Sequence, residues 1–596
     1  MPDSFSYTFD ENNISVSKLQ FVKVDFNNKK VIGIVQSTKK EPHLPSHTKA
    51  ILDVYPYLLP DFYLKLAHYI KDICFVSLST ALHSILPSSF SEKNISLFEK
   101  YANLHLPKKH IPTPLLIHYS TTRNKYRLII DQINYHLKDE EQLLYLLPSK
   151  NTAETAFDVL SKKNFNVYLW QNRKKDWKYV IEEKPQIILG SRSAVFAPFS
   201  NLKMIIMEDE HSSNYKSEQT PKYNTFDLVC FLTEIFNARL ILSSFAPSIE
   251  AKIKIKNTYQ EKTKKADIEI IDMKMEKEKG NYTMFSDILL ENIQESTPTS
   301  KTFIFLNRKG YSRAVLCRDC GWEAVCPNCS VNLIYHTSNY LICHWCRYRE
   351  ELPPLCPVCN SPDIKLSGKG TQKVEIEIKK KFRQMHIIRI DKDNPTCSNY
   401  QKANIIIGTE YAFDKINWQD VGVIGVIDGD FYKYIPNFKS VEEAYVIFKF
   451  FSLKVLENKT KLIIQSHDPT TPLIKAIKEK KDNIYYKSEI KLRQSLHYPP
   501  FAIVIKLSYK HKNEKKAIGE AMHIYHRLVK YIIKENKLEK SIDISKPYPA
   551  HPKKSGGKYI FHIAVKIISH REKILPIIRE KVPPDWTIDN NPTTLL

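Results

Sequence analysis

Eight of the eleven cysteines of this chain lie between residues 317 and 359, in four Cys-x-x-Cys pairs. Two thiolates separated by two residues can both face one tetrahedral Zn²⁺, so four pairs supply the ligands of two four-thiolate sites. Such closed sites are structural, because no coordination position is left open for chemistry. A redox dithiol needs one pair rather than four, and disulfides are rare in the cytoplasm. The cysteines are Cys317, Cys320, Cys326, Cys329, Cys343, Cys346, Cys356 and Cys359.

Spacing alone leaves the pairing of these cysteines open, since neighbouring pairs can share a metal or the outer pairs can close over the inner ones. His336 and His344 lie in the same segment, so a histidine ligand is an alternative, although eight thiolates already fill two sites. The other cysteines stand alone, and we expect them to be buried apolar fillers: Cys74, Cys230 and Cys397.

A second candidate site is the stretch LLIHYSTTRNKYRLII, residues 115–130. An apolar run, a short polar patch and an amphipathic helix follow one another, which is the setting of a nucleotide phosphate loop. The patch contains no glycine, however, and Gly-Lys-Ser/Thr occurs nowhere in the chain. Glycines let backbone N–H groups close around phosphates, and a β-carbon obstructs that approach.

Composition narrows the class of protein. The formal net charge is +24 and the pI about 9.2, which favours a nucleic acid partner, with a Lys-, Ile- and Asn-rich proteome as the alternative cause. There is no apolar run of about 18 residues, and the N-terminus lacks a basic region followed by an apolar core. We therefore expect a cytoplasmic, nucleoid-associated monomer with no membrane partner.

The elements that must position these residues follow from periodicity. Short apolar runs such as QLLYLLPSK, QIILG, MIIMEDE and LILSS suit the buried strands of a parallel sheet. The N-terminal segments FSYTF and FVKVDFNNKKVIGIV alternate as in a small β-barrel. An amphipathic helix is expected at KKAIGEAMHIYHRLVKYIIKEN in the last part of the chain.

The cysteine segment, which begins CRDCGWEAVCPNC (317–329) after FLNRKGYS (305–312), resembles the zinc module of the primosomal protein N′ (PriA) replication restart helicase family. The resemblance implies that Cys317, Cys320, Cys356 and Cys359 bind one Zn²⁺, and that Cys326, Cys329, Cys343 and Cys346 bind a second. It runs from residue 5 to about residue 550, through motifs in the family's order: GSRSAVFAPF (190–199), MIIMEDEH (204–211), SSFAPSIEA (243–251), IIIGTEYAF (405–413) and RQSLHYPPF (493–501).

The resemblance also implies contacts with DNA. In the family, a 3′-DNA-binding domain captures the 3′ end of a nascent strand, and Phe5, Gly33 and Lys49 stand at positions of its pocket, with Ser6 in place of the usual aspartate. Basic and aromatic residues around motif II suit single-stranded DNA, by stacking and by phosphate neutralisation. The alternative is that the tyrosines only pack the lobe surface. These residues are Arg192, Tyr215, Lys216 and Tyr223.

Aligned with the family, the elements that handle ATP and Mg²⁺ are degraded. His118, Thr121 and Arg123 replace the glycines of the phosphate loop, Asn124 its lysine and Lys125 its Ser/Thr; a register slip that brings Lys125 to a phosphate is the alternative.

Motif II, Asp-Glu-Glu-His in the family, is Glu208-Asp209-Glu210-His211 here, which displaces both catalytic carboxylates by roughly one C–C bond. Motif V decays to FDKINW, and the region aligned with motif VI (444–458) has no arginine, where an arginine finger is worth about 10³–10⁵ in rate.

These patterns predict an α/β protein with two RecA-like helicase lobes, an inserted double zinc module, an N-terminal barrel-like DNA-binding domain and a C-terminal α+β domain. Too few residues separate the first domain from the first lobe for a winged helix of about 60 residues, which the family carries there. The expected parts are a 3′-end-binding β domain (1–90), a linker (91–112), a first lobe (113–285), a second lobe (286–475) with zinc module 316–367, and the C-terminal domain (476–596).

Three functions are weighed. The first is a PriA-like restart factor that binds forked and single-stranded DNA, holds two Zn²⁺ and scaffolds primosome proteins and single-strand binding protein, with ATP-driven unwinding lost. The second is an active ATP-dependent 3′→5′ helicase with divergent motifs. The third is a zinc-ribbon nucleic-acid adaptor unrelated to restart, which explains the cysteines but not the ordered motifs of both lobes.

Overall fold

The computed structural model describes most of the chain, and everything below concerns that part. The described residues are 5–9, 15–39, 48–86, 95–101, 111–171, 173–261, 266–307, 315–317, 322, 324–327, 333–336, 340–343, 348–366, 371–395, 399–435 and 437–595. Across them, none of the helices combines the length and the apolar character that crossing a membrane requires.

The first lobe is built on a parallel sheet with the strand order β10-β4-β9-β8-β5-β7-β6. Strands β5 and β7 are buried along their whole length, as strands covered by helices on both faces are. The strands are β4 (Leu115–His118), β5 (Gln142–Leu146), β6 (Val167–Trp170), β7 (Ile187–Gly190), β8 (Leu202–Glu208), β9 (Arg239–Ser244) and β10 (Thr258–Gln260). The helices are α4 (Thr122–His136), α5 (Lys150–Ser161), α6 (Arg173–Glu183), α7 (Thr225–Phe236) and α8 (Ile249–Lys254).

The second lobe repeats this architecture with a parallel sheet in the order β11-β21-β20-β12-β19-β18. Its strands are β11 (Ile268–Asp272), β12 (Lys301–Phe305), β18 (Ile387–Ile390), β19 (Ile405–Gly408), β20 (Val421–Val426) and β21 (Lys461–Ser466). Its helices are α9 (Met273–Glu278), α10 (Asp287–Gln294), α11 (Thr371–Lys381), α12 (Ser440–Asn458), α13 (Pro472–Glu479) and α14 (Asp482–Ser495). Two buried parallel sheets confirm the α/β class expected from the apolar runs.

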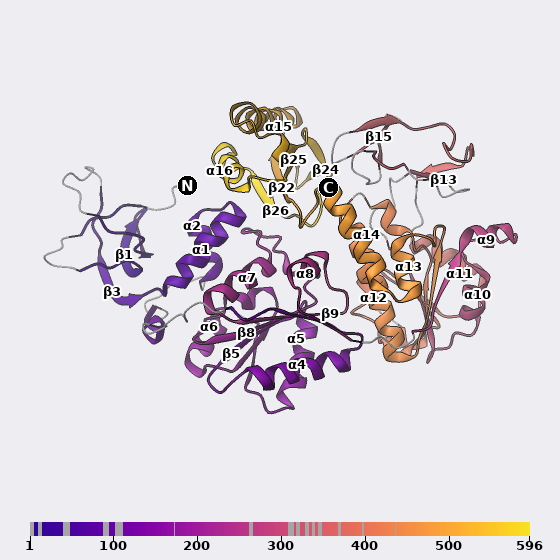
Figure 1. The fold of residues 1–596 in the computed structure, drawn as a ribbon, viewed down its shortest axis with the longest axis horizontal. Helices are drawn as coiled ribbons and strands as arrows, with labels where there is room; N and C mark the ends of the chain where they lie inside the picture. Colours follow the sequence, from indigo (N-terminus) through magenta and orange to yellow (C-terminus); the bar gives the residue numbers. More distant parts are fainter. Residues whose placement is uncertain are drawn as a thin grey trace.

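The cysteine-rich segment is inserted between β12 and α11, and its described strands lie apart from the lobe sheet (Figure 1). β13 (Val315–Cys317) pairs with β17 (Ile364–Leu366) and closes the base of the insertion. β14 (Ile334–His336), β15 (Tyr340–Ile342) and β16 (Arg349–Glu351) form a small antiparallel sheet. The insertion therefore leaves from one strand of the lobe and returns beside it, which keeps the lobe sheet intact.

The N-terminal part contains an antiparallel sheet in the order β2-β1-β3, with β1 (Gln20–Phe26), β2 (Lys29–Ile34) and β3 (Asp53–Leu58). Three described strands do not make a barrel, so the barrel stays a prediction. The helices that follow, α1 (Asp61–Cys74) and α2 (Leu78–Ile85), pack in one apolar core with the first lobe. Within the expected linker, the short helix η1 (Ser96–Tyr101) joins the same core, where Phe98 contacts the ring of Trp177.

The C-terminal domain is an antiparallel sheet with helices packed on it, in keeping with the α+β expectation. It lies above the first lobe in Figure 1, between α1–α2 and the cysteine insertion. Its strands are β22 (Ile503–His511), β23 (Ile542–Ile544), β24 (Tyr548–Ser555), β25 (Lys558–Ile567) and β26 (Thr587–Asn590). Its helices are α15 (Glu514–Leu528), the short η8 (Val529–Glu535) and α16 (Arg571–Lys581).

Two expected boundaries differ from the structure. The first lobe was expected to extend to residue 285, but β11 pairs with β21 in the second sheet, so the division falls before β11. The C-terminal domain was expected from residue 476, but α13 and α14 belong to the second lobe, where Tyr485 stacks on Tyr445 of α12 at 4.0 Å. The first difference arises because a short apolar run does not reveal which of two similar sheets it joins.

Candidate functional site

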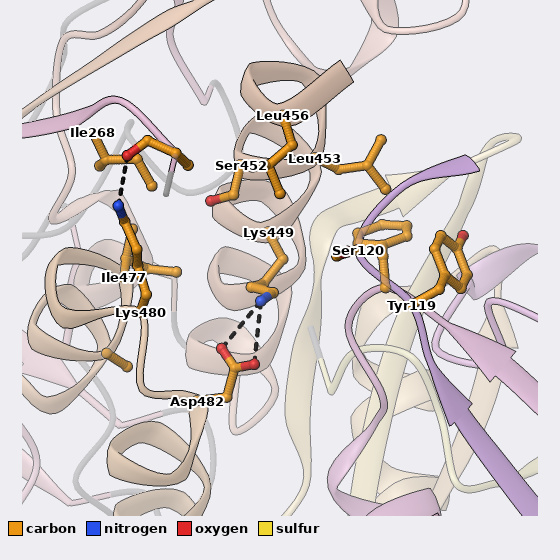
Figure 2. Close-up of a pocket in the computed structure, with 13 residues that line it drawn as sticks. Tyr119, Ser120, Ile268, Lys449, Ser452, Leu453, Leu456, Ile477, Lys480 and Asp482 are labelled. Atoms are coloured by element: carbon orange, nitrogen blue, oxygen red, sulfur yellow. Dashed lines mark hydrogen bonds and ion pairs between the residues drawn. The ribbon is translucent and has the colours of Figure 1, made fainter. Parts of the chain in front are cut away.

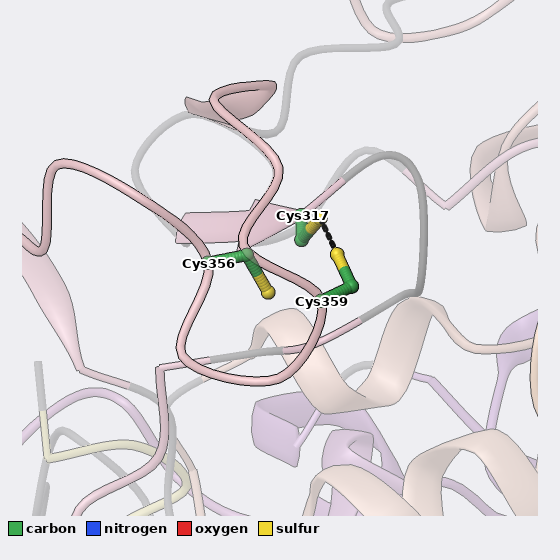
Figure 3. Close-up of side chains that lie close together, drawn as sticks. All are labelled: Cys317, Cys356 and Cys359. Carbon is green, nitrogen blue, oxygen red and sulfur yellow. Dashed lines mark hydrogen bonds between the residues drawn. The ribbon is translucent and has the colours of Figure 1, made fainter.

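Cysteines from the two ends of the insertion meet in space. The sulfur atoms of Cys317, Cys356 and Cys359 lie within 4.8 Å of one another, and Cys317 Sγ is 3.6 Å from Cys359 Sγ (Figure 3). In a tetrahedral site with Zn–S bonds of about 2.3 Å, the sulfur atoms lie about 4 Å apart. The spacing of these three sulfur atoms therefore fits one metal. The backbone N–H of Val358 also lies 3.4 Å from Cys356 Sγ, a contact that favours a thiolate. Three thiols from the first and the last Cys-x-x-Cys pair therefore form a site suited to Zn²⁺.

Of the other predicted zinc ligands, two lie within the described residues and three do not. Cys320, Cys329 and Cys346 lie outside the described residues. Cys326 and Cys343 are both buried in an apolar cluster of the insertion. The meeting of Cys317 with Cys356 and Cys359 fits the outer pairing that the resemblance implies, while the second Zn²⁺ site stays a prediction.

The turn after β4 ends at the carboxyl edge of the first sheet, where open α/β sheets bind their ligands. Thr121 caps α4 by accepting a hydrogen bond from the backbone N–H of Asn124 at 3.4 Å. None of residues 118–124 has a positive φ, so the backbone does not make the turns for which a phosphate loop uses glycine. Residues with side chains fit this turn because it is an ordinary helix start.

Carboxylates bind the N–H groups of this turn. Glu261 accepts hydrogen bonds from the backbone N–H of Ser120 at 2.8 Å and from the side-chain amide of Asn124. Glu457, from α12 of the second lobe, accepts from the N–H of Thr122 at 2.8 Å. A helix N-terminus attracts anions, and here the anions are two side chains of the protein itself.

Lys125 points from the first turn of α4 into the lobe. Its ammonium nitrogen lies 2.7 Å from Glu208 Oε1, and Tyr145 donates to Glu208 Oε2 at 2.7 Å. Lys125 is 5% exposed and Glu208 1%. Burial alone would lower the pKa of Lys125, but Glu208 raises it above its ordinary value, so the ion pair persists. The carboxylate at the Mg²⁺ position of motif II is therefore neutralised by a lysine of the same lobe.

Asp209, the next residue of motif II, has a φ of +47° and accepts a hydrogen bond from Tyr119 OH at 3.1 Å. Burial, and then the charge of Glu208, raise its pKa to about 7. A pKa near the working pH is what a general base uses, so this pKa does not itself weigh against water activation; what engages the Asp209 carboxylate is its hydrogen bond from Tyr119. Glu210 and His211 are occupied locally, by the N–H of Ser248 and the hydroxyl of Ser244.

His118 also lies inside the protein rather than in an open loop. Its Nε2 is 3.0 Å from the carbonyl oxygen of Phe245 and 3.8 Å from Asp482. Burial, with the nearby Lys449 ammonium, lowers the pKa of His118 to about 3, so the ring is neutral and donates to Phe245. A neutral buried imidazole offers no charge to a phosphate.

The helix aligned with motif VI has no arginine over residues 444–458. Its Lys449 lines the cavity beside the turn, where its ammonium group pairs with Asp482 at 3.1 Å. α12 presents Glu442 instead, which accepts from the N–H of Ile249 in the first lobe at 2.8 Å. Arg493 of α14 lies 3.0 Å from Glu442 and 2.8 Å from Glu489, and it is buried. This arginine holds two carboxylates of its own lobe, so it is not free to serve as an arginine finger.

The comparisons with known proteins agree along the chain. Residues 1–87 match the family described as the 3'DNA-binding domain (3'BD) of PriA. The replication restart protein PriA of Borreliella burgdorferi is 28% identical over 95% of this chain and 89% of its own length. The chain is similar to PriA replication restart proteins along nearly its whole length. The Bacillus subtilis PriA is 31% identical over 59% of this chain and 47% of its own length.

Among solved structures, the Mycobacterium smegmatis helicase Lhr bound to single-stranded DNA and AMP-PNP is 9% identical, with a TM-score of 0.34. The match covers 67% of this chain and 48% of that one. A likeness this low adds nothing to the description of the fold.

In the N-terminal part that matches the PriA 3′-DNA-binding domain, two of the three predicted pocket residues contact consecutive residues of β1. Phe5 is 54% exposed and meets the ring of Phe26 edge-on at 4.7 Å. Lys49 lies 3.0 Å from the carboxylate of Asp25, the neighbour of Phe26 on β1. Gly33 is on β2 opposite Val22, several residues away along the sheet. A DNA pocket at these residues stays a prediction.

The residues around motif II that are predicted to contact DNA make contacts within the protein in this conformation. Tyr215 is 1% exposed and donates to the carbonyl oxygen of Glu208 at 2.7 Å; Tyr223 is buried against Phe196. Lys216 is buried and lies 3.0 Å from Asp589 of the C-terminal domain. Arg192 donates to the carbonyl oxygen of Lys216 at 2.7 Å. No base can stack on the two tyrosines as placed, so the packing alternative describes them here, and a DNA role for any of the four residues is untested.

Sequence reasoning missed the residues that fill the nucleotide site. Glu261 is 137 residues from Asn124 and stands in no motif, and Glu457 is 335 residues from Thr122, in the stretch aligned with motif VI. The only signal near them was the absence of arginine in the stretch 444–458, which gave no hint that a carboxylate takes part.

Proposed function

We propose that this chain acts in PriA-type replication restart by binding forked and single-stranded DNA, and that it does so without ATP-driven unwinding. The observation that carries the proposal is the internal occupation of the nucleotide site. Glu261 and Glu457 hold the N–H groups of Ser120 and Thr122, and Lys125 holds Glu208. Phosphoryl transfer depends on placing phosphates, Mg²⁺ and water within a fraction of an ångström, and these internal contacts compete with that placement.

The DNA part of the proposal rests on the PriA 3′-DNA-binding family match over residues 1–87 and on the net charge of +24. Lysines and arginines that neutralise phosphates release counterions, so the affinity for forked DNA should fall steeply with salt. We further propose that two Zn²⁺ order the cysteine insertion as a platform for primosome proteins and single-strand binding protein. Cys317, Cys356 and Cys359 would hold the first ion together with Cys320.

The second candidate is an active ATP-dependent 3′→5′ helicase. The position of Lys125 favours it, because in working phosphate sites a lysine and the Mg²⁺-binding carboxylate also lie close together. ATP could then compete with Glu208 for the lysine. The glycine-free turn and the carboxylates on its N–H groups weigh against this candidate.

ATP hydrolysis in the presence of forked DNA separates the two. We expect turnover no higher than that of the variant Lys125→Met, because Glu261, Glu457 and Glu208 engage the N–H groups of the turn and Lys125. DNA-stimulated turnover that Lys125→Met abolishes would establish the active helicase instead. Lys150→Met, at an exposed lysine of α5, is the control for loss of one positive charge from the same lobe.

A further inference from the structure

One helix of the second lobe bonds the first lobe at two separate points. Near its end, Glu457 of α12 accepts from the backbone N–H of Thr122 at 2.8 Å. Near its start, Glu442 of α12 accepts from the backbone N–H of Ile249 at 2.8 Å. Fifteen residues separate the two glutamates, which is about 22 Å along a helix. Two contacts that far apart fix both the distance and the orientation of one lobe relative to the other.

Each of these carboxylates is held in place by its own lobe. Lys454 lies 2.8 Å from Glu457 Oε2, and Arg493 lies 3.0 Å from Glu442 Oε2. Burial alone would raise the pKa of each glutamate, yet the neighbouring cation and the N–H donor lower it in both cases. Both side chains are therefore ionised and positioned before they meet the first lobe, and charge-assisted hydrogen bonds are the stronger kind.

The surface between the two contacts is also closed. Tyr486 OH donates to the carbonyl oxygen of Pro247 at 2.6 Å, and the rings of Phe245 and Phe450 meet at 6.3 Å. The space that remains beside the turn is a cavity of about 40 Å³. Figure 2 shows it bordered by Tyr119 and Ser120 on one side and by helices of the second lobe on the other. A space of this size has room for water.

We propose that Glu457 and Glu442 form an interlobe clasp, which holds the two lobes closed without nucleotide. In this chain a carboxylate of the second lobe takes the place at the α4 N-terminus that a phosphate takes in a motor. Closure is then a permanent property of the fold, and the lobes present one rigid body to DNA. The proposal concerns the same turn as the proposed function, but it does not depend on whether ATP binds.

Hydrogen exchange of the full chain tests the clasp without any ligand. In Glu457→Ala the N–H of Thr122 loses a charge-assisted bond, so the peptide covering residues 119–126 should exchange about tenfold faster or more. The peptide covering residues 505–510 of the C-terminal domain should be unchanged. Glu479→Ala is the matched control: it removes a glutamate of the same lobe that is exposed and pairs with Lys481. Equal exchange at residues 119–126 in Glu457→Ala and Glu479→Ala would overturn the clasp.

A second variant keeps the test valid if Glu457→Ala misfolds. Glu457→Gln keeps an oxygen that can accept from Thr122 but loses the charge, so exchange at residues 119–126 should lie between the unaltered chain and Glu457→Ala. If Glu457→Ala exchanges fast everywhere, Glu457→Gln decides, and exchange identical to the unaltered chain would refute the proposal. Tight ATP binding by the unaltered chain would refute the proposed function and leave this comparison valid.

Discussion

Lys125 and Glu208 illustrate how single residues decide the chemistry of an inherited site. The lysine stands one residue beyond the position expected for a phosphate-binding lysine, and its partner is a glutamate where the family has an aspartate. Because Thr121 caps α4, Lys125 falls on the inner face of the first turn and reaches Glu208 at 2.7 Å. The two departures from the family pattern compensate each other, since the displaced cation meets the longer carboxylate.

Replacing Lys125 by methionine should destabilise the first lobe by about 3–5 kcal/mol, because Glu208 would be left charged and buried without a cation, with only the hydroxyl of Tyr145 beside it. Urea unfolding, followed by hydrogen exchange in β5 and β8, measures this loss. The double variant Lys125→Met/Glu208→Gln removes both charges and should recover most of it. If the double variant loses as much free energy of unfolding as the two single variants together, the ion pair is not the cause of the destabilisation.

Asp209 should make the stability of the first lobe depend on pH. Its pKa rises from 3.8 in the unfolded chain to about 7 in the fold, through burial and the charge of Glu208. Its contribution to the free energy of unfolding is fully present below about pH 4 and is lost as the pH rises through about 7. Asp209→Asn should therefore gain stability over the unaltered chain between pH 4 and 7. Glu154→Gln, at an exposed carboxylate of α5, is the control, and a gain independent of pH would contradict the account.

At the scale of elements, the periodicity of apolar residues predicted several strands and helices. The strand, polar turn and helix over residues 115–130 form as β4 and α4, and the apolar runs of both lobes form parallel sheets. The sequence could not assign β11 to its sheet, because its apolar run suits either one. Nor could it find Glu261 and Glu457, because their role arises only when the lobes meet.

The cysteine insertion allows a prediction at the same scale. We expect two Zn²⁺ per chain, and we expect Cys356→Ser to retain one, because a serine hydroxyl cannot replace a thiolate in the first site. Atomic emission of the purified protein gives both numbers. Cys74→Ser, at a buried cysteine of α1 outside the insertion, should keep both ions. One ion or none in the unaltered protein would show that the second site does not form.

At the scale of the whole molecule, the described contacts join the parts into one body. The C-terminal domain reaches the first lobe through Asp589 and Lys216, and it reaches the N-terminal helices through Arg579 and Asp72 at 2.9 Å. α12 joins the two lobes by its two glutamates. A scaffold of this kind can hold DNA in a fixed geometry, and its basic charge supplies the attraction.

The most direct test of the account is a titration of ATP beside a titration of forked DNA on one preparation. Calorimetry with ATP and Mg²⁺ should show no binding at concentrations where a working motor is saturated, while fluorescence anisotropy should show the fork bound with an affinity that falls steeply as salt increases. Stoichiometric ATP binding by the unaltered chain would contradict the account, because the N–H groups and the lysine of the site would then have to leave Glu261, Glu457 and Glu208.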